Sequence, residues 1–372
     1  MGKEKERRKT IAVLVSAFLL YLPLTFLGYG SDGDSYCVIN TAQTLIQQHK
    51  YVPSRYPGFV VHELATTLLF MLGGSFFTNL GTMVMSLLVI YCFLKICGYY
   101  DIPHKYLLAI FMIIQPFYYT ASTFTIDYLW ALGFLFIGYT LLINRRYILA
   151  GIFWGLAIGS RISSVLFVAA LVLAYFLTKE SNRNRVLLSA TIGVITGAAF
   201  YILPFLHAGR TFVFFTNYLT GKWNWIGYLV RFVYKSLYFW GLQTCIAFLF
   251  LSSLMINGLK RNYERKYKNV ILTSIIMIIV FEMMYLEIPT ENYYLLPILP
   301  FVLMLLGISL KKHRWLLISL IIIQFSYNFI NVNIARPDVP NNATTAKIGL
   351  WFEPGYLIND IIKRVNIDRL YR

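Results

Sequence analysis

Long apolar segments separated by short polar loops run through almost the whole chain. An α-helix needs about 20 apolar residues to cross the hydrocarbon core of a membrane. On this pattern we predict eleven spans, at 10–29, 80–97, 104–120, 125–143, 147–160, 162–178, 186–206, 228–257, 269–288, 292–310 and 314–332. The sequence therefore predicts an all-α fold, a polytopic transmembrane helical bundle.

A twelfth apolar segment, 59–77, is predicted not to cross the membrane. More than half of the 33 Lys and Arg residues lie in six clusters beside the spans. The clusters are Lys3–Lys9, Lys95 with Lys105, Arg145 with Arg146, Lys179–Arg185, Lys260–Lys268 and Lys311–Arg314. All six clusters lie on one side of the membrane only if the segment 59–77 does not cross it. Basic loops concentrate on the cytoplasmic side. We therefore expect a cytoplasmic N-terminus, an extracytoplasmic C-terminus and amphipathic helices at the outer face between the first two spans.

Composition agrees with a membrane protein. Of 372 residues, 58% are hydrophobic and 13% are charged, whereas about a quarter are charged in soluble domains. The net charge of +17 could indicate nucleic-acid binding, but the positive residues fall in short loops, as topology signals do. We expect the lipid bilayer of a plasma (inner) membrane as partner and no nucleic acid.

Two domains are predicted. Residues 1–332 form the transmembrane domain, whose outer loop with juxtamembrane helices is 30–78. Residues 333–372 form a short extracytoplasmic tail. In this tail Tyr356, Ile361 and Val365 follow helical spacing, which predicts a short amphipathic helix.

The predicted topology gathers charged residues at the outer face. They are Asp32, Asp34, Arg55, His62, Glu63, Asp127, Arg161, Glu287 and Glu291. Ionisable groups close to lipid are expensive and mark functional sites. The chain has no phosphate-binding glycine loop, no HExxH and no GxSxG, which argues against a nucleotide-driven pump and a serine hydrolase.

The order of several short motifs resembles that of GT-C glycosyltransferases, especially the protein O-mannosyltransferase and lipid A aminoarabinose transferase branch. Asp34-Ser35-Tyr36, then Ala42, Leu45 and the segment Tyr51–Gly58, is similar to the first outer loop of that family. The resemblance spans roughly residues 10–310. Its later parts are Gln115–Tyr119, Thr125–Asp127, Gly151–Arg161 and Tyr293–Pro300.

The resemblance implies a polyprenyl-phosphate-linked sugar donor, inversion, and a glycan, lipid or protein as acceptor. An acid of the first loop acts as the base in this family. The spacing to Ala42 favours Asp34, and Asp32 remains an alternative. Asp127 matches the acid of the second loop, but it also fits the N-cap of the helix that follows.

Basic and polar residues complete the expected site. Arg55 and Arg161 are candidates for the phosphate, Arg161 having the alternative role of an interfacial anchor. His62 and Glu63 could instead form a hydrogen-bonded pair that faces the bundle. The expected substrate-binding residues are Arg55, Tyr56, Arg161, His62, Glu63, Lys222, Glu291 and Tyr293.

We expect no required cofactor, although Asp32 and Asp34 could together hold a divalent cation such as Mg²⁺ or Mn²⁺. A different class of function, a transporter or flippase of a lipid-linked or anionic substrate, is the alternative. Transporters tend to carry internal repeats and broken helices at the midplane. This chain shows no visible repeat, and its acids cluster at one predicted face.

Overall fold

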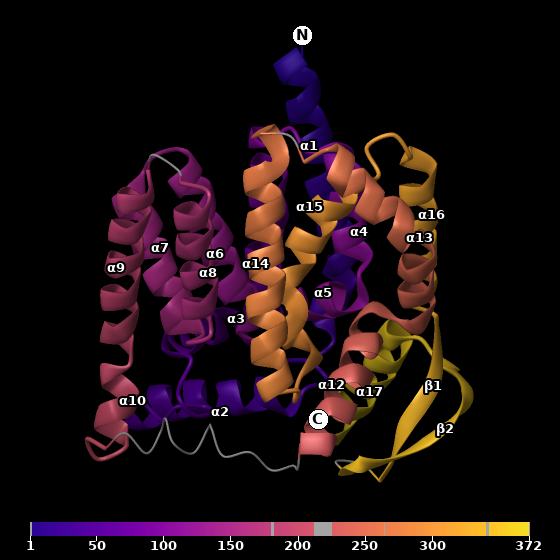
Figure 1. Ribbon diagram of the computed structural model, residues 1–372. Helices are drawn as coiled ribbons and strands as arrows, with labels where there is room; N and C mark the ends of the chain where they lie inside the picture. The colour runs from indigo at the N-terminus through magenta and orange to yellow at the C-terminus, as the bar shows by residue number, and fades with distance from the viewer. Residues whose placement is uncertain (1, 180–181, 212–224, 264, 340–341, 372) are drawn as a thin grey trace. The chain divides into compact units, whose positions relative to one another are not determined.

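The computed structural model describes residues 2–179, 182–211, 225–263, 265–339 and 342–371, which are mostly helical (Figure 1). The helices up to residue 121 are α1 (Gly2–Tyr21), η1 (Leu22–Phe26), α2 (Gly33–Gln48), α3 (Val60–Tyr99), α4 (Lys105–Ile114) and α5 (Pro116–Ala121). Then follow α6 (Tyr128–Ile143), α7 (Tyr147–Ser160), α8 (Ser164–Leu177), α9 (Arg183–Phe200) and α10 (Ile202–His207). The remaining elements are α12 (Trp225–Trp240), α13 (Leu242–Arg261), α14 (Arg265–Glu287), η2 (Asn292–Ile298), α15 (Leu299–Ser309), α16 (Arg314–Ser326), β1 (Ile330–Val339), β2 (Asn342–Pro354) and α17 (Tyr356–Tyr371).

The helices are those of a membrane bundle. Within the described residues, six helices are long and apolar enough to cross a membrane, and five more apolar helices have 10–17 residues. Each predicted span contains at least one helix. The helical class is confirmed, and the count of eleven crossings stays a prediction.

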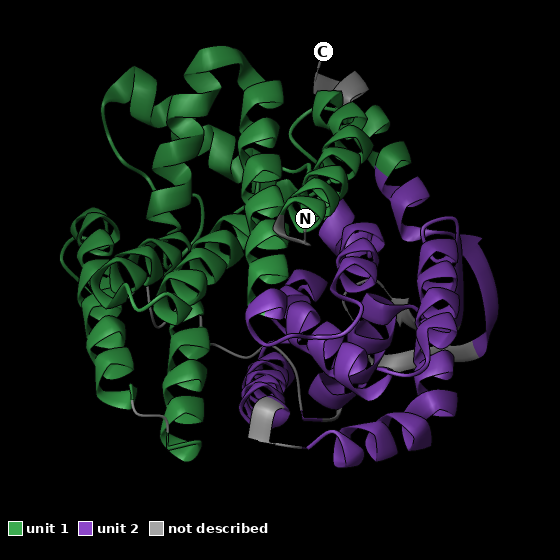
Figure 2. Ribbon diagram, turned by 90° about the horizontal axis from the view of Figure 1, so that it is seen from above, with its two compact units in different colours: residues 1–96, 120–220, 361–372 green, residues 97–119, 221–360 purple. Residues whose placement is uncertain are grey.

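The chain divides into two compact units (Figure 2). Unit 1 consists of residues 1–96, 120–220 and 361–372, and unit 2 of residues 97–119 and 221–360. Every candidate acid near the first predicted span, together with Asp127 and Arg161, belongs to unit 1.

Helix α3 is broken where the predicted surface helix meets the predicted span. Its 40 residues would measure about 60 Å if straight, twice the thickness of the hydrocarbon core. The backbone leaves helical geometry at Gly73 and Gly74, and Gly74 has φ +63°, in the left-handed region that favours glycine. The segment before the break, 60–72, is therefore short for a crossing helix, in line with the predicted outer-face helix.

Small residues bring α7 and α9 of unit 1 together. Gly151, Gly155 and Gly159 recur every fourth residue on one face of α7. A Cβ added to Gly155 would lie 1.8 Å from Thr196 Oγ1 of α9, and one added to Gly151 would lie 2.6 Å from a backbone oxygen. Glycines at this spacing allow two helix backbones to approach closely. The contact fixes the end of α7, where Arg161 follows.

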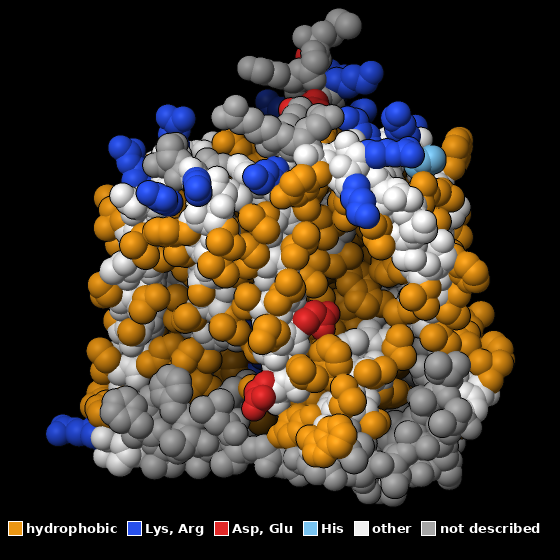
Figure 3. Space-filling model, in the orientation of Figure 1, with side chains coloured by type: hydrophobic (Ala, Val, Ile, Leu, Met, Phe, Trp, Pro, Cys, Tyr) orange, Lys and Arg blue, Asp and Glu red, His pale blue; other side chains and the backbone are white. Residues whose placement is uncertain are grey.

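The two ends of unit 1 differ in charge. Exposed Arg145, Arg146, Lys179, Arg183 and Arg185 occupy the loops from α6 to α7 and from α8 to α9, and Lys and Arg side chains gather over these helix ends in Figure 3. Helix α2 lies across the opposite ends of α6–α9 (Figure 1). The segments that precede α6 and follow α7 lie at this second end, so the candidate site and the basic loops are at opposite ends of unit 1.

Three basic loops of unit 2 also meet at one end. His104 Nε2 lies 3.1 Å from the carbonyl oxygen of Lys311, and the Tyr267 hydroxyl donates to the carbonyl of Asp101 at 3.2 Å. These contacts join the loop before Lys105 to the loops that carry the clusters Lys260–Lys268 and Lys311–Arg314. The side of the membrane on which these loops lie stays a prediction.

Two stretches differ from the prediction. The segment 228–257 is not one span, because Gly241 with φ +79° separates α12 from α13. The tail contains an antiparallel hairpin, in which Val332 pairs with Phe352, before the predicted helix. The alternation Ile330-Asn331-Val332-Asn333 has the period of a strand, and α16, the helix of the last predicted span, ends before it at Ser326.

Candidate active site

The first turn of α2 places two carboxylates in different roles. Asp32 is the N-cap residue, and its Oδ1 accepts a hydrogen bond of 3.0 Å from the backbone N–H of Asp34. An Asp N-cap satisfies a backbone donor and complements the positive end of the helix dipole. Asp34 lies two residues further along, and its Oδ2 accepts from Arg55 Nη1.

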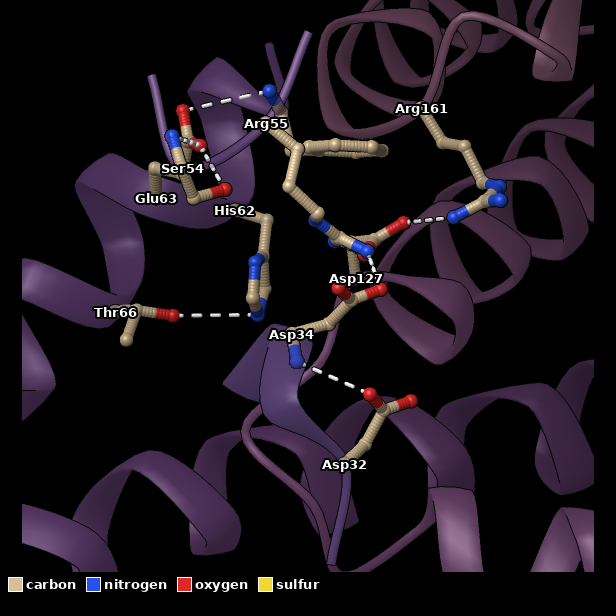
Figure 4. Close-up of polar contacts among 10 residues, drawn as sticks. Asp32, Asp34, Ser54, Arg55, His62, Glu63, Thr66, Asp127 and Arg161 are labelled. Atoms are coloured by element: carbon tan, nitrogen blue, oxygen red, sulfur yellow. Dashed lines mark hydrogen bonds and ion pairs between the residues drawn. The ribbon is translucent and has the colours of Figure 1, made fainter. Parts of the chain in front are cut away.

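Arg55 bridges two carboxylates (Figure 4). Its Nη1 contacts Asp34, and its Nη2 donates to Asp127 Oδ1 at 2.8 Å. The guanidinium lies 4.4 Å from the centroid of the Phe59 ring. Cation–π contact and two carboxylates hold the planar fork of arginine in one orientation.

Asp127 is the buried centre of the network. Its side chain has no exposed surface, and its Oδ2 accepts from Arg161 Nη1. Asp127 occupies the N-cap position of α6, but its side chain makes no capping hydrogen bond to the start of that helix; its carboxylate instead contacts the two arginines. Burial raises the pKa of this carboxyl, but the guanidinium groups of Arg161 and Arg55 outweigh burial and hold the pKa below its ordinary value.

Arg161 faces the protein. Its side chain is 9% exposed, and its guanidinium lies 4.1 Å from the Tyr128 ring centroid and 5.6 Å from that of Phe59. An interfacial anchor would extend to water or headgroups. The contact with Asp127 instead makes Arg161 the last member of a four-residue network, Asp34–Arg55–Asp127–Arg161, which we call the charge network.

Glu63 orders the loop that carries Arg55. Its carboxylate accepts from the Tyr51 hydroxyl at 2.5 Å, the Ser54 backbone N–H at 2.8 Å and the Phe59 backbone N–H at 3.3 Å. The Ser54 hydroxyl donates as well. One buried carboxylate thus fixes both ends of the segment 51–59, and with it the position of Arg55.

His62 and Glu63 do not form the expected pair in the described structure. His62 is fully buried, and its Nε2 lies 3.2 Å from the Thr66 hydroxyl. Adjacent residues of a helix point about 100° apart, so the two side chains serve different neighbours. The Nδ1 atom of His62 is buried with no hydrogen-bond partner among the described residues.

The remaining predicted residues lie elsewhere. Tyr56 is 39% exposed, beside Arg55 in the loop. Glu291 and Tyr293 belong to unit 2, where the Tyr293 hydroxyl lies 2.7 Å from that of Tyr356. Lys222 is outside the described residues.

No group of three or more His, Cys, Asp or Glu side chains is arranged to hold a metal ion in the part of the chain that the structure describes.

Arg364 of α17 is a structural residue of the site that sequence reasoning missed. It is fully buried and donates to the carbonyls of Leu24 and Thr123, each at 3.1 Å, and to the Thr123 hydroxyl at 2.8 Å. These backbones lead into α2 and to Asp127. The helix pattern gives no sign of this role, because an arginine on an amphipathic helix is ordinarily solvated.

Neither protein-family models nor curated protein sequences match this chain. Its structure is similar to two crystal structures of ArnT from Cupriavidus metallidurans. The one bound to undecaprenyl phosphate has a TM-score of 0.61 at 13% identity, over 81% of this chain and 60% of ArnT. The apo structure has a TM-score of 0.57 at 13% identity, over 81% of this chain and 59% of ArnT.

ArnT is a lipid A aminoarabinose transferase with the GT-C fold. The chain described here has the fold of ArnT, and its apolar helices are those of an integral membrane protein. It spans about 60% of the length of ArnT.

Proposed function

We propose that this protein is a membrane glycosyltransferase. It moves a monosaccharide from a polyprenyl-phosphate donor to a glycan, lipid or protein acceptor at the extracytoplasmic face, with inversion. The observation that carries the proposal is the charge network, in which one arginine bridges a partly exposed and a fully buried carboxylate. The polyprenyl donor is supported by the undecaprenyl phosphate in the similar ArnT structure.

Exposure separates the roles of the two carboxylates. The side chain of Asp34 is 30% exposed, whereas that of Asp127 has no exposed surface. An acceptor hydroxyl can come within hydrogen-bond distance of Asp34 but not of Asp127. Asp34 is therefore the base, and Asp127 fixes the two arginines.

The reaction needs a base and a cation. The acceptor O–H gives its proton to the Asp34 carboxylate as its oxygen forms a bond to the anomeric carbon. The bond from that carbon to the phosphate oxygen breaks, and its electron pair stays on the phosphate. The polyprenyl phosphate leaves with one more negative charge, which a fixed arginine stabilises.

Arg55 is the arginine that meets the phosphate. Its side chain is 21% exposed and that of Arg161 only 9%, so Arg161 acts through Asp127. Tyr56 and His62 flank the network and contribute contacts to the substrate, and Lys222, Glu291 and Tyr293 remain proposed contacts. The positive charge of Arg55 makes a divalent cation unnecessary, so transfer is expected to persist in excess EDTA.

The orientation follows from the basic loops. Positive residues favour the cytoplasmic side, and the charge network lies at the other end of unit 1. The active site and the C-terminus are then extracytoplasmic and the N-terminus cytoplasmic, in a plasma (inner) membrane.

Transfer of a labelled sugar tests the proposal. Purified protein in nanodiscs is incubated with labelled polyprenyl-phosphate sugars and a membrane glycan extract, and new glycosidic products are separated and counted. Asp34→Asn is expected to abolish transfer while leaving folding and lipid binding intact. The matched control is Asp101→Asn, an exposed carboxylate with φ +52°, a backbone conformation that asparagine tolerates.

A second assay, in sealed proteoliposomes, tests the alternative function. Movement of the sugar-linked lipid to the other leaflet without formation of a glycosidic bond would indicate a transporter or flippase. Full transfer by Asp34→Asn would refute the assigned base.

A further inference from the structure

The charge network is neutral as it stands. Two aspartates and two arginines alternate along it, and each of its three ion pairs joins opposite charges. The exposed end of the network is Asp34, whose carboxylate is already paired with Arg55. A carboxylate beside a guanidinium is a weaker base than a solvated one, because the positive charge favours its ionised form.

The two arms of Arg55 are not equivalent. The contact with Asp127 is buried, whereas Asp34 is partly exposed. A phosphate that arrives from the open side therefore competes with Asp34 and leaves the buried arm in place. The Nε atom of Arg55 is buried and has no hydrogen-bond partner in the described residues, so the exposed part of this guanidinium is the part that contacts Asp34.

We propose that the phosphate of the donor lipid takes the Nη1 contact of Arg55 from Asp34, so that Asp34 becomes a competent base only when a donor is bound. This inference rests on the proposed function. It makes binding ordered, with the donor before the acceptor. It also keeps the base weak while the site holds no sugar to transfer.

The balance of charge during transfer is consistent with Arg55 contacting first the Asp34 carboxylate and then the donor phosphate. With a phosphodiester donor bound, the four side chains and the phosphate carry a net charge of about −1. During transfer Asp34 gains the acceptor proton and loses its charge, while the leaving phosphate gains one. The total is unchanged, and the negative charge moves to the group that Arg55 already contacts.

Carbodiimide labelling of Asp34 tests this release. Protein in nanodiscs at pH 6 reacts with a water-soluble carbodiimide and an amine, with and without saturating undecaprenyl phosphate, and mass spectrometry measures the labelling rate of Asp34. Binding of the lipid is measured separately by native mass spectrometry. Without its cationic partner the Asp34 carboxylate is protonated more easily and reacts faster, and we expect labelling to accelerate about tenfold. Undecaprenol, which lacks the phosphate, is expected to have no effect.

Two variants define the outcome. In Arg55→Gln, labelling is expected to be fast without lipid and to gain nothing from it. In Arg55→Lys, which retains the charge but cannot bridge two carboxylates, the lipid is expected to have a smaller effect than in the wild type. If undecaprenyl phosphate binds the wild type but does not accelerate the labelling of Asp34, the proposal that the phosphate displaces Asp34 from Arg55 is refuted. Failure of the lipid to bind at all overturns the proposed donor site instead.

Discussion

Replacing Asp127 with Asn tests whether the charge network holds the site together. The substitution keeps the size of the side chain and removes the charge to which both arginines bind. Asparagine offers one acceptor oxygen in place of two, so one guanidinium loses its partner. Arg55 is partly exposed and can turn to water, but Arg161 is 9% exposed and cannot.

The expected decrease in the free energy of unfolding follows from this difference in exposure between the two arginines. Breaking a buried ion pair by removing one partner costs about 3–5 kcal/mol. Because the released Arg55 regains some hydration, we expect the lower end, about 3 kcal/mol. The free energy of unfolding is measured in mixed micelles by titration with SDS, with Asp101→Asn as the matched control, whose exposed carboxylate should contribute less than about 0.5 kcal/mol.

The pH dependence gives a second readout. The folded pKa of Asp127 is depressed below the ordinary 3.8, so its contribution is complete above that ordinary value and is lost as the pH falls through the folded pKa. The stability difference between wild type and Asp127→Asn should stay constant from pH 8 to about pH 5 and shrink only in stronger acid. A loss below about 1 kcal/mol at pH 7, equal to that of the control, would show that Arg161 finds another partner and that the network is not structural.

Three further substitutions test the base, the helix packing and the orientation. Asp32→Asn should retain at least about a tenth of the wild-type transfer rate and lose little stability, because Asn caps a helix as well as Asp. A loss of transfer as complete as that of Asp34→Asn would assign the base to Asp32. Gly155→Ala should lower the free energy of unfolding by about 1–3 kcal/mol or more, since its Cβ would lie 1.8 Å from a hydroxyl of α9; an unchanged SDS midpoint would contradict the close packing. In a cysteine-free background, Gln47→Cys, at an exposed position of α2, should react with an impermeant maleimide from outside intact cells, and Arg146→Cys only after permeabilisation. The reverse pattern would invert the proposed topology.

Much of the fold could be predicted from the apolar pattern. The span predicted at 147–160 coincides with α7 (Tyr147–Ser160), because burial in lipid leaves a continuous apolar run bounded by charged loops. The break at Gly241 could not be predicted, since glycine inside an apolar run is compatible with an uninterrupted helix. The hairpin after Ser326 had a signal in its alternating residues, but its first residues were assigned to the span 314–332.

The candidate site was predictable residue by residue but not contact by contact. Asp34, Arg55, Asp127 and Arg161 were expected at one face, and the structure joins these four. The partners of Glu63 could not be predicted, because four donors converge on it only after the segment 51–59 folds back onto α3. The buried contacts of Arg364 likewise depend on tertiary packing rather than on local sequence.

Burial, rather than residue type, decides what the two central aspartates can do. They are chemically identical and both bind Arg55, yet one lies against solvent and the other has no exposed surface. A buried carboxylate between two guanidiniums is held ionised and cannot readily accept a proton, so Asp127 is suited to fixing cations. Asp34 is paired with Arg55 and has an exposed side, so loss of that contact is enough to increase its basicity. The charge network thus concentrates the chemistry at its exposed end while its buried end holds the geometry constant.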